Sequence, residues 1–343
     1  MTSAARYEVK SVGRGFKSLP WHIYIAAFRI ITVVQKATER MAVFGIGEFH
    51  ELELRPRERQ MLSDLAAHIA TEAKGQRIIV GVERNARFYK SVADEFQKQK
   101  ASLITADQAE LDEKAKQIAF SVMQESWLGD IKKHPELAPR LRGLKVPVSF
   151  LRAARDLIWP LVKHGAVPKF VNLRSHKELR AIEKPSERLF MEAEEELRRE
   201  VAVPALQNLL DPDVAVRKAY ELGRTGEKHA AYNKFLLEDS KRMIRRWHRL
   251  TKDKGGIGIW YVGESHDPHA RYLLPVMTNQ SYHSVSLFPQ KPARWGLSSS
   301  GNPALIDRIA DAVQMGHHAG TTELAQREAA KLEKAARRGR AAK

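Results

Sequence analysis

Two segments that lie more than two hundred residues apart each contain the motif Gly-Glu-x-His. "MAVFGIGEFH" contains Glu48 and His50, and "GIWYVGESHD" contains Glu264 and His266. A carboxylate beside an imidazole can serve as a general base with its orienting partner, and it can also hold a divalent ion such as zinc, manganese or iron. A single copy carries little information, since its glutamate could cap a helix. Both copies follow an apolar run and precede a helical pattern, which favours a catalytic or metal site.

The elements that must position these groups are short apolar runs, separated by segments whose sequences have helical periodicity. Strands are predicted at residues 41–47, 77–83, 145–151, 256–263 and 283–288. The first two flank a segment with helical spacing, and a strand-helix-strand unit favours parallel pairing. We therefore expect an α/β fold, with a mostly parallel central sheet flanked by helices and a long helical insertion between the early and late strands. Ligands bind beyond the carboxyl ends of such strands, so the two motifs would share one crevice if their strands are neighbours.

An aspartate in the helical middle of the chain has an unusual position. Along "AYNKFLLEDSKRMIRRWHRL", Asp239 falls on the same stripe as Leu236, Met243 and Trp247. A carboxylate that faces a core is costly unless it is paired or hydrogen-bonded. Asp239 is therefore either a buried group satisfied by an arginine or by backbone amides, or a site carboxylate that meets the imidazoles. Arg246, at the edge of the stripe, is the expected partner in both cases.

Further candidates lie beside the strand ends. Glu83 closes the second predicted strand, and Arg84 follows it. His269 is within helical reach of His266, although an exposed position in the first helical turn is the more common arrangement. Asp267 is expected to cap that helix, because proline follows it directly.

Composition and motifs exclude several classes of protein. The 343 residues contain no cysteine, which excludes disulfides, thiolate metal sites and cysteine nucleophiles and fits a cytoplasmic location. P-loop, Gly-x-Gly-x-x-Gly, Gly-x-Ser-x-Gly and His-Glu-x-x-His patterns are all missing.

Arg152 and Asp156, which follow the strand predicted at 145–151, are weaker candidates. The formal net charge of +17 predicts attraction to polyanions such as nucleic acid or acidic lipid.

The chain is expected to have one main domain with basic ends. Residues 1–40 would form a basic segment with an apolar element, whose apolar run at 21–34 is too short for a transmembrane span. Residues 41–320 would form a single α/β domain with a helical insertion at about 153–253. Residues 321–343 would form a basic helical or disordered tail. We expect a soluble protein.

The order of these features resembles a superfamily that groups erythromycin esterase-like, ChaN-like and Tiki/TraB proteins. The matching motifs are "GEFH", "VGVERN", "LEDSKRM" and "VGESH", in order between about residues 41 and 290. The chain departs from the pattern in having three residues between Asp239 and Met243, and in having Glu264 where many relatives carry a non-acidic residue. The resemblance implies a metal-independent hydrolase, a metal-dependent peptidase or a haem-binding protein.

Three hypotheses follow. In the first, a hydrolase acts on a small-molecule or peptide substrate: His50 is the general base, Glu48 orients it, and His266 with Glu264 completes the site or holds a divalent ion. Supporting roles then fall to Glu83, Asp239, His269 and Arg84. In the second, a basic protein with a vestigial crevice binds nucleic acid or an acidic surface through its termini and "KRMIRRWHRLTKDK". In the third, the protein binds haem.

Overall fold

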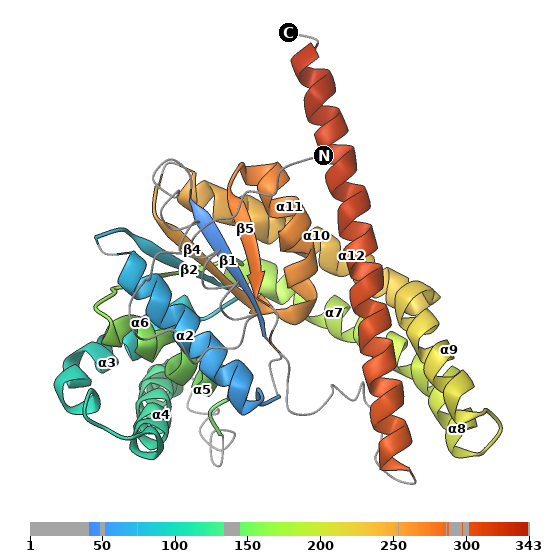
Figure 1. The fold of residues 1–343 in the computed structure, drawn as a ribbon, viewed down its shortest axis with the longest axis horizontal. Helices are drawn as coiled ribbons and strands as arrows, with labels where there is room; N and C mark the ends of the chain where they lie inside the picture. The colour runs from blue at the N-terminus through green and yellow to red at the C-terminus, as the bar shows by residue number, and fades with distance from the viewer. Residues whose placement is uncertain are drawn as a thin grey trace, which may run out of the picture.

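The centre of the protein is a five-stranded parallel sheet (Figure 1). The structure is a computed structural model that describes residues 41–48, 52–73, 75–133, 145–252, 254–285, 287, 297 and 302–341. The strands are β1 (Ala42–Glu48), β2 (Ile78–Val82), β3 (Lys169–Asn172), β4 (Ile257–Gly263) and β5 (Ser281–Val285). Their order in the sheet is β3-β2-β4-β1-β5, and every pair is parallel. The predicted α/β fold class is confirmed.

Helices cover both faces of this sheet and extend beyond it (Figure 1). The α-helices are α2 (Pro56–Glu72), α3 (Ala86–Leu103), α4 (Gln108–Lys133), α5 (Val148–Arg152), α6 (Trp159–Lys163), α7 (His176–Leu197), α8 (Val203–Leu206), α9 (Pro212–Thr225), α10 (Glu227–Thr251), α11 (Asp267–Thr278) and α12 (Pro303–Ala341). Two π-helical segments, η2 (Ala153–Ile158) and η3 (Arg198–Ala202), and a 3₁₀ turn, η4 (Glu264–His266), interrupt this series. None of the helices in the described part of the chain is long and apolar enough to cross a membrane.

Alternate residues of the strands pack into two different cores. Phe44 and Ile259 join a cluster formed by α2, α3, α4, η2 and α6. Val43 and Trp260 point to the opposite face, where α10, α11 and α12 close the second cluster. Because successive side chains of a strand point to opposite faces, continuous apolar strands need cover on both sides.

Helix α10 approaches the sheet closely. Its Trp247 is fully buried and lies against Gly81 and Gly258, where an added Cβ would come within 2.9 Å and 2.7 Å of the indole ring. Leu236 and Met243 are buried on the same side, so the predicted apolar stripe is confirmed. This contact fixes where Asp239, on the same face of α10, meets the end of the sheet.

The strand predicted at residues 145–151 is wrong. Helix α5 lies there instead, and Pro147 takes its N-cap position with extended φ and ψ. Proline cannot donate to a sheet ladder, which explains why this apolar run does not pair. The third strand is β3, a half-exposed four-residue edge strand inside the stretch expected to be helical.

The helices of the insertion form a core with the C-terminal helix. Residues of α7, η3, α8, α9 and α12 bury a third apolar cluster around Val201 and Ile309. Helix α12 runs through residue 321 without a break, and Ala325 and Ala329 are buried, so the first part of the expected tail packs against the domain. The expectations for residues 1–40 lie outside the described residues.

Candidate functional site

The two repeated motifs lie side by side at the carboxyl edge of the sheet. Strands β1 and β4 are neighbours, and Glu48 pairs with Gly263 in their parallel register. Gly47 permits this proximity, because an added Cβ would lie 3.1 Å from the Cα of Glu264. His50 and the side chain of Glu48 lie outside the described residues, so their approach to His266 stays a prediction.

A buried arginine that follows β3 is the centre of a polar network at this edge. The Nε of Arg174 donates to Oδ2 of Asp239 at 3.0 Å, its Nη2 contacts the same oxygen, and its Nη1 donates to Glu83. The other oxygen of Glu83 accepts a hydrogen bond from the backbone N–H of Gly263. The network thus joins the ends of β2, β3 and β4 to helix α10. Asp239 has an arginine partner, but that partner is not Arg246, whose Nε donates to a backbone carbonyl oxygen at the end of β3.

The charge of Arg174 is secured by its two carboxylate partners. Burial by itself lowers the pKa of Arg174, but Glu83 and Asp239 raise that pKa by more, so it ends above its ordinary value. The side chain of Asp239 is only 3% exposed, and that of Arg174 only 8%. A buried ion pair with well-placed hydrogen bonds is strongly destabilised when one partner is removed. The sequence analysis does not identify Arg174 because it does not predict β3; an arginine two residues after the end of a strand is the signal that marks it.

The hydrogen bonds of His266 define its tautomer. Its Nε2 lies 2.9 Å from Nη2 of Arg174, and its Nδ1 lies 2.7 Å from Oγ of Ser240. A guanidinium has only donors, so Nε2 must accept and the ring proton must sit on Nδ1, which donates to Ser240. Both ring nitrogens therefore have protein partners. The sequence predicts that His266 completes the site with Glu264 or holds a divalent ion; in this arrangement Arg174 and Ser240 contact both of its ring nitrogens.

Ser240 links a second histidine to the network. Its Oγ lies 2.8 Å from the carbonyl oxygen of Leu236 and 2.9 Å from Nδ1 of His269. His269 is fully buried, so the exposed position expected for it is wrong. Burial, followed by the nearby His266 and His317, lowers the pKa of His269 well below its ordinary value and keeps the ring neutral.

Glu264 does not join the Arg174 network among the described residues. Its two oxygens meet Nε2 of Gln314 and Nδ1 of His318, each at 3.0 Å, and both partners lie on α12. The hydrogen bond that Glu264 accepts from His318 raises the pKa of His318. Arg84, which follows Glu83 in the sequence, has an exposed side chain. Glu264 therefore ties α12 to the end of β4.

Asp267 does not cap α11 with its side chain, contrary to expectation. Its carboxylate instead accepts hydrogen bonds from the hydroxyl of Tyr282 at 2.6 Å and from the hydroxyl of Ser284 at 2.5 Å. Burial raises its pKa, although these two hydrogen bonds act in the opposite direction. These bonds fix the start of α11, and so the turn that carries His266, against β5.

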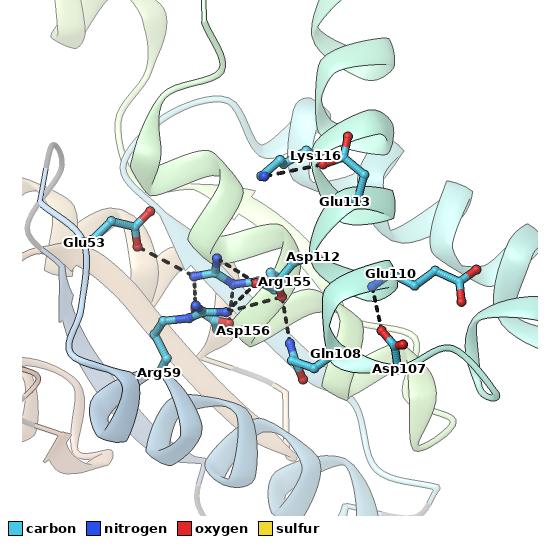
Figure 2. A network of polar contacts seen from close by, with 10 residues as sticks. All are labelled: Glu53, Arg59, Asp107, Gln108, Glu110, Asp112, Glu113, Lys116, Arg155 and Asp156. Atoms are coloured by element: carbon cyan, nitrogen blue, oxygen red, sulfur yellow. Dashed lines mark hydrogen bonds and ion pairs between the residues drawn. The ribbon is translucent and has the colours of Figure 1, made fainter.

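Asp156 belongs to a separate polar network, shown in Figure 2. Its carboxylate accepts from Nε of Arg155 at 2.7 Å and lies 3.5 Å from Nε of Arg59. Asp112 on α4 lies 3.1 Å from Arg59, and Glu53 lies 3.8 Å from Arg155. This network joins α2, α4 and η2, and it does not include the strand-end groups.

Arg152 contacts the chain just beyond the first motif. It is fully buried at the end of α5, and its Nη2 donates to the carbonyl oxygen of Leu52. Leu54 is also fully buried. The segment that follows His50 is therefore anchored to the domain from residue 52 onward.

No group of three or more histidine, aspartate or glutamate side chains placed to hold a metal ion occurs within the described residues. His266 is not disposed to bind one, because Arg174 and Ser240 take both of its ring nitrogens. Metal binding through Glu48 and His50, and haem binding, stay predictions.

Comparisons of the chain with protein-family models, with curated proteins and with solved structures found no match.

Proposed function

We propose that the carboxyl edge of the sheet is the active site of a hydrolase that cleaves an ester or amide bond of a small molecule or peptide. One observation supports this most: Glu83 and Arg174 join the ends of three strands and α10 in a buried ionic network. Parallel α/β sheets bind their ligands at this edge. Buried ionisable groups with specific charged partners are also typical of functional sites.

The reaction would start from the end of β1. His50 takes a proton from water, and the hydroxide formed attacks the carbonyl carbon of the substrate. The bond to the leaving group then breaks, and the leaving group takes the proton from His50. Glu48 orients the imidazole of His50 and stabilises its protonated form.

Arg174 and His266 are positioning residues in this proposal. Arg174 holds the ring of His266 in one tautomer, and Glu83 fixes the end of β4 through Gly263. A site whose polar groups are already oriented needs little reorganisation when charge develops on the substrate. A divalent ion bound by His266 would have to displace Arg174 first, so we propose a reaction that needs no metal ion at this histidine.

The test is hydrolysis of a panel of chromogenic esters and short peptides by the wild type, His50→Ala and Glu48→Gln. His164→Ala is the matched control, because His164 is exposed and precedes β3, so it lies towards the amino ends of the strands and not at their carboxyl ends. We expect activity with at least one substrate, retained in the control and in EDTA, and reduced by about a hundredfold or more in both site variants. Equal activity in all four proteins would refute the proposal.

A further inference from the structure

The outward face of α10 carries three arginines that make no ion pair among the described residues, beside Glu238, whose ion-pair partner is Lys241. Arg242, Arg245 and Arg249 are all exposed, and none makes an ion pair within 4 Å among the described residues. At 100° per residue they fall within about 60° of one line, opposite the buried stripe of the helix. Glu178 of α7 lies within electrostatic range of Arg249 but does not pair with it.

Several exposed cations on other helices of this protein have acidic partners instead. Lys90, Lys98 and Lys116 each have an acidic partner three or four residues away on their own helix. Arg198 and Arg327 do as well. On α10, Arg242, Arg245 and Arg249 instead stand three, four and seven residues apart, so like charges face one another. Such spacing destabilises an isolated helix by a few tenths of a kcal/mol per pair, a cost that an anionic partner would relieve.

We propose that this face, the α10 ridge of Arg242, Arg245 and Arg249, binds the phosphate backbone of a nucleic acid. A helix rises about 1.5 Å per residue, so the three guanidinium groups start about 4.5 Å and 6 Å apart along its axis. Phosphates follow one another at about 3.4 Å along the axis of each strand, within reach of side chains of this length. Guanidinium also pairs with two phosphate oxygens at once.

The ridge fits a nucleic acid better than a membrane surface. Helices that bind membranes carry large apolar side chains at the level of the bilayer. Among the described residues no exposed large hydrophobic side chain lies on α10, whose apolar residues are used by the core. The proposed contact is therefore electrostatic and independent of base sequence.

This surface is separate from the hydrolase proposal. The cations point away from the core, whereas Asp239 and Ser240 on the same helix face the strand ends. Binding at the ridge would hold the protein on a nucleic acid without occupying the carboxyl edge of the sheet.

The test is binding of the full chain to 30-nucleotide single-stranded RNA and DNA and to duplex DNA, measured by fluorescence anisotropy between 50 and 300 mM salt. The ridge variant is Arg242→Gln with Arg245→Gln and Arg249→Gln. The control variant is Lys90→Gln with Lys98→Gln and Lys116→Gln, which removes the same charge from exposed, ion-paired positions. Anionic lipid vesicles provide a second polyanion.

In the ridge variant we expect affinity for nucleic acid at 50 mM salt to fall about tenfold or more, and the slope of log affinity against log salt to fall by about 2 to 3. The control variant should change either quantity much less. Equal losses in the two variants, an unchanged slope in the ridge variant, or binding to vesicles alone would overturn the proposal. Thermal unfolding of both variants verifies that they remain folded.

Discussion

Arg174 donates to Nε2 of His266 across 2.9 Å, although these residues follow β3 and β4, which are separated in the sheet by β2. The glutamate at the end of the intervening strand, Glu83, contacts both sides: it pairs with Arg174 and accepts from the backbone of Gly263. One guanidinium therefore couples three strand ends, and its removal should alter the side-chain contacts at each of them.

Replacing Arg174 by methionine should lower the free energy of unfolding by about 3 to 5 kcal/mol, because the buried carboxylate of Asp239 and the half-buried carboxylate of Glu83 would both lose this ion-pair partner. Urea denaturation of the variant measures this loss. Arg180→Met, at an exposed position on α7, is the control and should change stability by less than about 0.5 kcal/mol. Adding Asp239→Leu to Arg174→Met should recover part of the loss. A loss below about 1 kcal/mol for Arg174→Met would contradict the role assigned to the ion pair.

His266 should carry its proton on Nδ1. Side-chain ¹⁵N chemical shifts of ¹⁵N-histidine-labelled protein distinguish the two neutral tautomers. In Ser240→Ala, the loss of the shared hydroxyl should shift the Nδ1 signals of both His266 and His269, with a cost of about 1 to 3 kcal/mol in stability. Ser102→Ala, which removes an exposed hydroxyl, should leave both signals in place. A wild-type His266 protonated on Nε2 would refute the hydrogen-bond assignment.

Stability should fall as the pH drops below about 6.5. Burial lowers the pKa of His229 to about 4 and that of His317 to about 3, whereas the unfolded chain takes up these protons near 6.5. The unfolded state thus binds more protons in this range, and the stabilisation present at neutral pH is lost on acidification. Between pH 7 and pH 5 each of the two histidines should lower the free energy of unfolding by about 2 kcal/mol.

Urea denaturation at both pH values measures this effect. His229→Gln should reduce the pH dependence by about 2 kcal/mol, whereas His176→Gln, at an exposed position, should not change it. Equal pH dependence in the wild type and His229→Gln would contradict the assignment.

Much of the fold follows from apolar runs that are long and fully buried. The patterns at residues 77–83 and 256–263 correspond to β2 and β4, because strands covered on both faces are apolar at every position. Strand β3 has only four residues, half-exposed at the edge of the sheet, and gives no such signal. At residues 145–151 an apolar run is present, but Pro147 starts a helix there.

The candidate site was predictable where it depends on strand ends and not where it depends on pairing across the sheet. Glu83 and Asp239 are recognisable because one closes a strand and the other interrupts an apolar stripe. Their shared partner, Arg174, follows the strand that the pattern missed. Glu264 is turned towards α12 by Gln314 and His318, which lie about fifty residues further along the chain. A local sequence pattern cannot predict a contact between residues so far apart in the chain.

The central claim is that the end of β1 and the Arg174 network form one site. Spectra of the histidine side chains in the wild type and in His50→Ala test it without a known substrate. If the claim is right, removal of the His50 imidazole shifts the ¹⁵N signals of His266 and leaves those of the distant His164 unchanged. Signals of His266 that stay in place in His50→Ala would show that the two motifs do not share a site, in contradiction to the proposed active site.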